Sequence, residues 1–273
     1  GILIDDVKNV HLNELEVTNN VLAFDLFNYS SLTINNNSVD NNIIGIYARV
    51  LQDSLDDALI KNTNFSNQLN VFLTPNSLSE LEFENCYLNS SFFIEGSYGE
   101  DIPSDYGDLR LAGAIGSKIK FKDSYYDIED VAYFDAGDSY VEEIEFNTEL
   151  QNYWTLAVNV IDTADSSQSI PYIPIDIIEG GESVDLNEDG IKEDFIVTDE
   201  EGWARTYLLG NITDKNGLVE PSPVYHVEAT NTHVVNAVAI SDPFTMIAPK
   251  IIILDLEAGE EFNRQAGLNV SSY

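Results

Sequence analysis

The stretch LTINNNSV, residues 32–39, decides the fold of the first half of the chain. Apolar residues stand at its first, third and eighth positions, with a polar corner between them. The same spacing is approached from residues 10, 32, 58, 81, 119 and 144, which gives steps of 22, 26, 23, 38 and 25 residues. The apolar sets are Val10, Leu12 and Val17; Leu32, Ile34 and Val39; Ala58, Ile60 and Phe65; Leu81, Phe83 and Leu88; Ile119, Phe121 and Tyr126; and Ile144 and Phe146, where Gln151 breaks the third position. A recurring spacing in the twenties indicates a solenoid of stacked, near-identical coils.

Each coil is expected to be built from strands. LTIN at residues 32–35 and LEFE at residues 81–84 alternate apolar and polar residues, which sends side chains to opposite faces. Four residues after each leading apolar residue stands a polar residue, usually a short one that favours a tight bend. These corner residues are Glu14, Asn36, Asn62, Asn85, Asp123 and Thr148. The pattern predicts a right-handed parallel β-helix over residues 1–151, because it lacks the regular leucines of a leucine-rich repeat and the 3.6-residue period of a helical repeat.

The longest step contains a segment rich in Gly, Asp and Tyr, residues 97–116. We interpret it as a loop inserted at one corner, since insertions in repeat proteins gather on one face, often the binding face. A solvated loop without a ligand is the alternative, because surface loops tolerate added length.

Beyond Gln151 the repeat gives way to longer alternating runs, such as residues 154–160 and 252–256. Turn dipeptides at Asp189-Gly190 and Asn216-Gly217 separate such runs. About six or seven strands without an intervening helical pattern predict an antiparallel β-sandwich over residues 152–259. Residues 260–273 have little strand character and are expected to form a C-terminal tail. The fold class is therefore all-β, with two domains.

The second half carries a family resemblance. TLAVNVIDTADSSQSIPYIPIDII (residues 155–178), followed by TDEEGWARTYLL (residues 198–209), resembles small immunoglobulin-like or carboxypeptidase-regulatory-like modules. The first half resembles pectin-lyase-like β-helix repeats. Their succession is similar to archaeal cell-surface and surface-layer proteins, which implies an architecture and a location at the cell surface more than an activity.

The composition is strongly acidic. Asp and Glu number 48 against 12 Lys and Arg, which gives a formal net charge of −36. Such a surface repels nucleic acid and anionic lipid, so neither nucleic-acid binding nor membrane insertion is expected. Cations are the expected binding partners, because salt, divalent ions or the counterions of a packed assembly screen the repulsion between the acidic side chains. A soluble acidic protein without ion dependence is the alternative.

The single cysteine, Cys86, excludes an intramolecular disulfide bond and is expected to be a small, partly buried side chain rather than a nucleophile. The chain has no initiator Met and no apolar leader, so Gly1 is interpreted as a processed or cut end. Six Asn-x-Ser/Thr sequons are compatible with an exported, glycosylated surface. They lie at Asn28, Asn36, Asn64, Asn89, Asn211 and Asn269.

The sharpest chemical motif is DLNEDGIKED, residues 185–194. Ca²⁺ takes about six to eight oxygen ligands, and a D-x-[DN]-x-D-G loop brings the oxygens of positions 1, 3 and 5 together while the glycine allows a sharp turn. The expected ligands are the side chains of Asp185, Asn187 and Asp189, the backbone carbonyl of Ile191, and the carboxylate of Glu193 or Asp194. Position 12 is Ile196 instead of Glu, which favours a short structural calcium loop over a helix-loop-helix hand. The alternative is an acidic hairpin tip in which Asp-Gly serves only as a turn.

Catalysis is not expected. Hydrolysis of a polysaccharide needs converging carboxylates, and lyase chemistry needs a base with a cation or arginine beside the uronate. Asp105, Asp108 and Arg110 of the inserted loop are the best cluster, and charged loop residues are usually solvated. His11, His226 and His233 share no metal-binding spacing.

These features favour a non-catalytic extracellular structural protein, a subunit of a surface layer, sheath or filament that is stabilised by calcium. The repeat begins within the first dozen residues without a polar capping segment. We therefore expect the first coil to offer unpaired backbone groups to another copy, in head-to-tail assembly. A glycan-binding adhesin, which would use the 97–116 loop and exposed tyrosines, is the second hypothesis, and a polysaccharide lyase or hydrolase is the third.

Overall fold

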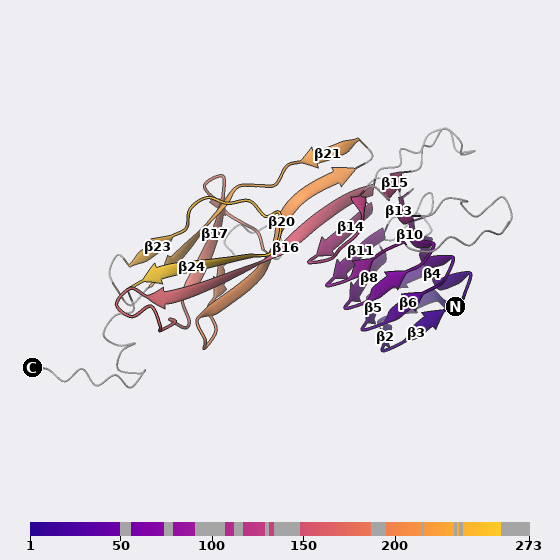
Figure 1. Ribbon diagram of the computed structural model, residues 1–273, viewed down its shortest axis with the longest axis horizontal. Helices are drawn as coiled ribbons and strands as arrows, with labels where there is room; N and C mark the ends of the chain where they lie inside the picture. The colour runs from indigo at the N-terminus through magenta and orange to yellow at the C-terminus, as the bar shows by residue number, and fades with distance from the viewer. Residues whose placement is uncertain are drawn as a thin grey trace, which may run out of the picture. The chain divides into compact units, whose positions relative to one another are not determined.

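The computed structural model describes residues 1–49, 56–73, 79–90, 107–111, 117–128, 131–133, 148–186, 195–214, 216–231, 234 and 237–257. These residues form strands and no α-helix (Figure 1), so the predicted all-β character is confirmed. They divide into two compact units. Unit 1 comprises Gly1–Asn152 and Ile212–Val219, and unit 2 comprises Tyr153–Asn211 and Glu220–Tyr273.

Unit 1 is built from three sheets, and each of the first repeats supplies one strand to each sheet. The first sheet runs β1 (Ile2–Lys8), β4 (Leu22–Ser30), β7 (Ile44–Arg49), β10 (Leu69–Leu73), β13 (Gly107–Leu111), β15 (Val131–Tyr133). The second runs β2 (His11–Asn13), β5 (Leu32–Asn35), β8 (Asp56–Lys61), β11 (Ser79–Glu84), β14 (Ser117–Lys122), and continues into β16 (Thr148–Asp162), β20 (Trp203–Asp214) and β21 (Gly217–Glu220). The third runs β3 (Glu16–Thr18), β6 (Ser38–Asp40), β9 (Asn64–Ser66), β12 (Tyr87–Leu88). The pairings among β1 to β15 are parallel.

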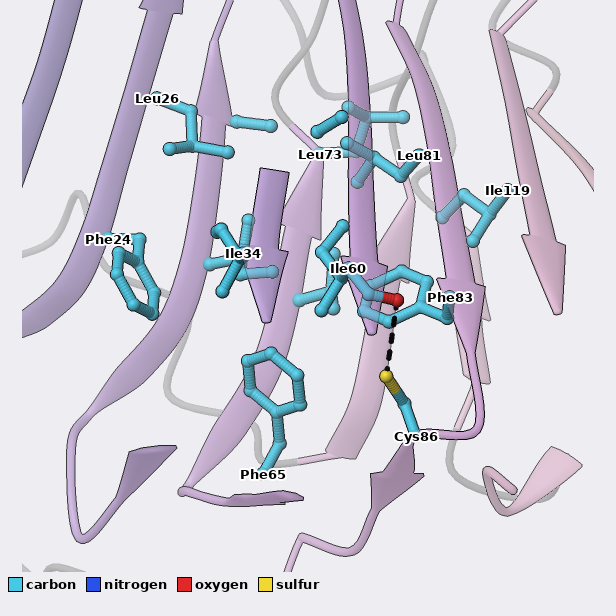
Figure 2. Close-up of a cluster of buried hydrophobic side chains, with 14 of the residues drawn as sticks. Phe24, Leu26, Ile34, Ile60, Phe65, Leu73, Leu81, Phe83, Cys86 and Ile119 are labelled. Atoms are coloured by element: carbon cyan, nitrogen blue, oxygen red, sulfur yellow. Dashed lines mark hydrogen bonds between the residues drawn. The ribbon is translucent and has the colours of Figure 1, made fainter. Parts of the chain in front are cut away.

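The register stacks the repeated apolar residues as the spacing predicts. In the second sheet one column consists of Leu12, Ile34, Ile60, Phe83 and Phe121. Figure 2 shows Ile34, Ile60 and Phe83 side by side within the buried cluster. The Phe83 ring stacks on Phe121, with 5.3 Å between ring centroids. Because the stacked inward residues meet their counterparts in the neighbouring repeats, a continuous core runs through unit 1. A smaller buried cluster of the same unit consists of Ile43, Ile44, Leu69 and Phe72.

The predicted corners are confirmed at five of six positions. Glu14, Asn36, Asn62, Asn85 and Asp123 all have positive φ, between 46° and 56°. Asn and Asp tolerate this left-handed conformation better than most residues, which explains their recurrence there.

The sixth predicted corner, Thr148, is wrong. Thr148 is a buried residue of β16, and Leu150 of the same strand belongs to the core of unit 1. The apolar pair Ile144 and Phe146 that suggested this corner lies outside the described residues. A β-branched residue suits a strand as well as a bend, so its type alone did not separate the two.

Part of the predicted inserted loop is also corrected. Within residues 97–116, Gly107–Leu111 is β13, a strand of the first sheet that pairs with β10 and β15. Leu109 and Leu111 are buried in the core of unit 1. The rest of the segment lies outside the described residues.

Unit 2 contains a second, mostly antiparallel sheet. It consists of β17 (Pro174–Glu179), β18 (Glu182–Ser183), β19 (Phe195–Val197), β22 (Tyr225–Thr230) and β23 (Val238–Ile240). Its pairings are antiparallel, as predicted. β24 (Lys250–Leu256), however, pairs with β16 in parallel, so the expectation of a wholly antiparallel domain is wrong.

The core of unit 2 lies between these strands. It includes Val158 of β16, Ile177 of β17, Val227 of β22 and Leu254 of β24, all buried. The unit boundary falls within β16, between Asn152 and Tyr153, and Ile212–Val219 belongs to unit 1 although the sequence places it in the second domain.

Candidate functional site

A column of polar side chains bridges neighbouring repeats where the second sheet turns into the third. The residue after each corner residue occupies this position. The polar members are Asn37, Thr63 and Ser124, with Cys86 between the last two and apolar Leu15 at the same position of the first repeat. Ser124 shows the pattern most clearly. Its Oγ accepts the Cys86 N–H at 2.9 Å and donates to the Phe83 carbonyl at 3.0 Å. Asn37 makes the corresponding bond between the first two repeats, where its Oδ1 accepts the Leu15 N–H at 2.7 Å. These bonds satisfy backbone groups that the corner leaves without strand partners.

Cys86 is the weakest member of this column. Its Sγ lies 3.4 Å from the carbonyl oxygens of Ile60 and Glu84, and the bond to Ile60 is drawn in Figure 2. Burial raises the pKa of the thiol to about 12, so at neutral pH it is protonated and a poor nucleophile. Sulfur is a weak donor, and the side chain therefore acts mainly as a small buried filler, as the sequence predicts.

A second column of asparagines lies where the third sheet turns back into the first. Asn42 Oδ1 accepts the Asn20 N–H at 2.9 Å, while its Nδ2 donates to the Val17 carbonyl at 2.8 Å and to Asn67 Oδ1 at 2.9 Å. Asn67 repeats the arrangement by donating to the Val39 carbonyl at 2.8 Å. Asn42 and Asn67 are fully buried. The polar tracts DNN (residues 40–42) and SNQ (residues 66–68), which begin with the last residues of β6 and β9, thus supply internal links between repeats.

The outer face of the second sheet carries lysines against glutamates. Lys120 Nζ lies 2.9 Å from Glu80 Oε1, and Lys122 Nζ lies 2.9 Å from Glu82 Oε1 on the neighbouring strand. Both ion pairs run diagonally between β11 and β14, because the register sets Lys120 opposite Glu82 and Lys122 opposite Glu84. Part of the scarce positive charge thus neutralises carboxylates within unit 1. Opposite charges on neighbouring strands stabilise the sheet.

The first repeat forms the end of all three sheets. β1, β2 and β3 are the terminal strands of the first, second and third sheets. Leu3 on β1 is 62% exposed, and Leu12 and Leu15 are only partly buried although they pack on the core. The ends of the three ladders thus coincide at one surface, which we call the first-repeat edge.

The predicted calcium loop connects two strands that lie along one side of β17. β18 pairs with Ile178 and Glu179, and β19 pairs with residues 174–176, both antiparallel. The Val184 N–H donates to the Ile177 carbonyl at 2.8 Å, and Phe195 stands opposite Asp176. The described residues that flank this segment, Val184 and Phe195, therefore lie at adjacent positions along β17. Of the predicted ligands, Asp185 is described, whereas Asn187, Asp189, Ile191, Glu193 and Asp194 lie outside the described residues.

Asp176 is a carboxylate that the motif did not reveal. Its Oδ2 accepts a hydrogen bond from Ser183 Oγ at 3.0 Å. Its Oδ1 is buried and has no hydrogen-bond partner among the described residues. A buried carboxylate oxygen without a partner is costly, and it lies beside both ends of the predicted loop. Among the residues that the structure describes, no three His, Cys, Asp or Glu side chains are grouped to hold a metal ion.

The structure describes two of the three residues in the candidate catalytic cluster of Asp105, Asp108 and Arg110. Asp108 and Arg110 belong to β13, so they are strand residues and not loop residues, and Asp105 lies outside the described residues. His11 is an exposed residue of β2. His226 Nε2 lies 3.3 Å from Glu228 Oε1 on the same strand, and His233 lies outside the described residues. The described histidines are thus far apart in the topology and share no site.

Two exposed tyrosines lie together at the third sheet. The Tyr87 and Tyr125 rings are stacked, with centroids 4.9 Å apart and planes 15° from parallel. Each ring thus covers one face of the other, and only the outer faces and edges are left for a sugar, which stacks on an aromatic face. This contact explains the exposed aromatic pair without a ligand.

The sequons differ in their surroundings. Asn36, Asn64 and Asn89 are exposed, and Asn28 and Asn211 are partly buried. Asn28 Nδ2 also donates to Asp6 Oδ1 at 3.0 Å. Asn269 lies outside the described residues.

In the described part of the chain, no helix has the length and apolar character that crossing a membrane requires. Neither a protein-family model nor a curated protein matches the chain. The function is therefore inferred from the residues and their geometry.

Proposed function

We propose that unit 1 is a right-handed parallel β-helix, that unit 2 is an immunoglobulin-like β-sandwich, and that the protein is a non-catalytic structural subunit of a surface layer, sheath or filament outside the cell. The observation that carries this proposal is the first-repeat edge, where β1, β2 and β3 end three sheets at one surface. Among the described strands, none pairs with the outer side of β1, β2 or β3, and these strands contain no proline that would block pairing. A strand edge of this kind is a template for pairing with another chain.

The direction of the free backbone groups follows from the third sheet. The Ser38 N–H donates to the Leu15 carbonyl at 3.0 Å, so the backbone groups of Leu15 face β6. Because backbone groups of alternate residues in a strand point to opposite sides, those of Glu16 point away from β6, along the first-repeat edge. A strand of a neighbouring copy that pairs there extends the ladder.

The opposite ends of the sheets indicate which strands of a neighbouring copy take part in the proposed contact. Among the described residues, the first sheet ends at β15, and the third is extended past β12 by a parallel bridge between Tyr87 and Tyr125, whereas the second continues into β16, β20 and β21. In this proposal, head-to-tail contact involves β1 and β3 of one copy with β15 and the segment at Tyr125 of the next. Such a contact is heterologous, and repeated heterologous contacts make filaments when they do not close into a ring.

The test uses Glu16→Pro, with Glu16→Ala as the matched control. Glu16 is exposed, so neither change disturbs the core. Proline removes the outward N–H and blocks strand approach, whereas alanine keeps the backbone donor. Sedimentation velocity should show a series of linear oligomers of increasing size for the unmodified chain and for Glu16→Ala. Glu16→Pro should sediment as a monomer. A monomer in all three samples, at millimolar calcium and across salt concentrations, would refute the proposal.

Calcium is proposed as the structural ion of the 185–194 loop. Two features support it. The described residues that flank the loop lie at adjacent positions along β17, and the buried Oδ1 of Asp176 has no hydrogen-bond partner among the described residues. A bound Ca²⁺ neutralises clustered carboxylates and holds the loop oxygens together. The ion has no catalytic part in this proposal, because it serves to stiffen one edge of unit 2.

Calorimetric titration with CaCl₂ tests the ion site. We expect binding by the unmodified chain, loss of binding in Asp185→Asn, and weaker binding in Asp176→Asn. Asp242→Asn is the matched control, since Asp242 is an exposed carboxylate elsewhere in unit 2, and its affinity should be unchanged. Equal affinity in all four proteins would mean that calcium binds as a diffuse counterion and not in this loop.

A further inference from the structure

The Asn216-Gly217 dipeptide lies at the turn between β20 and β21, which are neighbours in the second sheet (Figure 1). The sequence marks it as a turn, and neither the proposed head-to-tail contact nor the calcium loop uses it. Both residues are exposed. Asn216 Nδ2 reaches Asp214 Oδ2 only across 3.4 Å, which is long for a hydrogen bond, so the side-chain amide is loosely held.

Gly217 presents a backbone nitrogen with open surroundings. Its φ of +100° lies in the region that favours glycine, and a Cβ atom built on it would meet no heavy atom of the described residues within 4 Å beyond the adjacent positions. No side chain of its own covers this nitrogen on the side of Asn216. Attack of the nitrogen on Asn216 Cγ closes a five-membered ring, and a reaction between two groups already held close together is strongly favoured.

We infer that Asn216 converts spontaneously into an aspartyl or isoaspartyl residue. Hydroxide takes the proton of the Gly217 N–H, and the nitrogen attacks Asn216 Cγ. The N–Cγ bond forms, the Cγ–Nδ2 bond breaks, and Nδ2 leaves as ammonia with a proton from water. Water then opens the cyclic imide at Cγ to give aspartate, or at the backbone carbonyl carbon to give isoaspartate. The sum is one water consumed and one ammonia released, without an enzyme, a cofactor or an oxidant.

The exposed corner asparagines of unit 1 lack these features. Asn62 is followed by Thr63, a buried, β-branched residue whose side chain hinders approach to its own backbone nitrogen. Asn62 Nδ2 donates to Asn35 Oδ1 at 3.0 Å, and Asn62 Oδ1 accepts from Asn85 Nδ2 at 2.7 Å, so this amide is held at both ends. Conversion is therefore expected at Asn216 and not at Asn62, although both side chains are exposed.

The product places a new negative charge beside a buried one. Asp214 is 8% exposed, and its Oδ1 accepts the Asn216 N–H at 2.7 Å. Conversion to aspartate replaces the Nδ2 donor, which faces Asp214 Oδ2, with a carboxylate oxygen. Like charges this close repel, and the repulsion is larger where one of them is shielded from water. Because Ile212–Val219 belongs to unit 1, the repulsion loosens the β20–β21 hairpin at the end of the second sheet.

Peptide mapping by mass spectrometry measures the conversion. The full chain is incubated in warm, mildly alkaline buffer beside Asn216→Gln and beside the free peptide of residues 212–220. The Asn216 peptide should gain the mass by which a carboxylic acid exceeds an amide, within the time that the free peptide needs for complete conversion. Asn216→Gln keeps the amide but would have to close a larger ring, so its peptide should stay unchanged, as should the Asn62 peptide. An intact Asn216 in the folded chain when the free peptide is fully converted, or equal conversion at Asn62, would overturn the inference.

Charge variants test the consequence for the hairpin. Asn216→Asp reproduces one product, and native-state hydrogen exchange of the β20–β21 amides should be faster than in the unmodified chain. Adding Asp214→Asn keeps an oxygen that accepts the backbone N–H of residue 216 but removes the repulsion, so it should restore the slower exchange. Adding Asp242→Asn instead, at an exposed carboxylate, is the matched control and should not restore it. Equal exchange in Asn216→Asp and the unmodified chain would refute the repulsion. Both tests read a single hairpin, so they are independent of assembly and of calcium.

Discussion

The two units handle buried polar groups in different ways. In unit 1 the same position recurs from repeat to repeat, so Asn42 and Asn67 form a column that joins each repeat to the next. In unit 2 two buried polar side chains, Thr198 and Asn231, tie segments that are distant in the sequence. Thr198 Oγ1 accepts the Ile173 N–H and donates to the Ile170 carbonyl, and Asn231 Nδ2 donates to the Glu257 carbonyl. Unit 1 is thus held by nearest-neighbour contacts, and unit 2 by individual long-range ones.

The largest expected effect comes from removing a stacked ring. Phe83 is fully buried and contacts Phe65 on one side and Phe121 on the other. Phe83→Ala should lower the free energy of unfolding by about 3–5 kcal/mol. Native-state hydrogen exchange should show the loss concentrated in the repeats on either side. Equal loss of protection in unit 2 would contradict the nearest-neighbour account.

The asparagine columns provide the next contrast. Asn42→Ala should cost about 2–4 kcal/mol, because it leaves the Asn20 N–H and the Val17 carbonyl without partners. Asn35→Ala is the matched control, since its Oδ1 only accepts a bond from exposed Asn62 Nδ2, and it should stay within about 0.5 kcal/mol. Urea titration measures both. Similar costs would show that the buried column does not join the repeats.

A smaller effect is expected from Cys86, whose ionisation should make the free energy of unfolding depend on pH. The folded pKa of Cys86 is raised to about 12, whereas an unfolded cysteine titrates near 8.5. Between these values the unfolded chain loses a proton that the folded chain keeps, so stability is fully present below about pH 8.5 and falls by about 1.4 kcal/mol per pH unit above it. By pH 10 the loss should reach about 2 kcal/mol.

Cys86→Ser is the comparison for this effect. Serine does not titrate in this range, so the slope of stability against pH between 8.5 and 10 should flatten in the variant. Burial also raises the pKa of Tyr126 and Tyr225, but tyrosine titrates near 10 when unfolded and contributes mainly above this window. An unchanged slope would show that the thiol is more accessible than its burial indicates.

What the sequence predicted follows the same contrast between units. The stacking of one apolar position was predictable because the same spacing recurs in each repeat. The register of Ile34, Ile60 and Phe83 confirms it. The strand position of Thr148 was not predictable, because the repeat ends there and the long strand β16 begins. The parallel pairing of β16 with β24 was also out of reach, since strand alternation gives no information about the direction of a distant partner.

The candidate sites were predictable to a lesser degree. The calcium motif is a local pattern and could be read from the chain, but Asp176 comes to it through β17, and no spacing rule connects the two. The internal role of Asn42 and Asn67 was hidden for a related reason. Asparagine is common both in exposed turns and in buried ladders, and only the stacking of repeats separates the two.

Electron microscopy of the full chain at millimolar calcium, with and without chelator and beside Glu16→Pro, tests the structural role most directly. Strings of end-joined particles that are absent in Glu16→Pro and lose order on chelation are the predicted result. Dispersed single particles under every condition would contradict it.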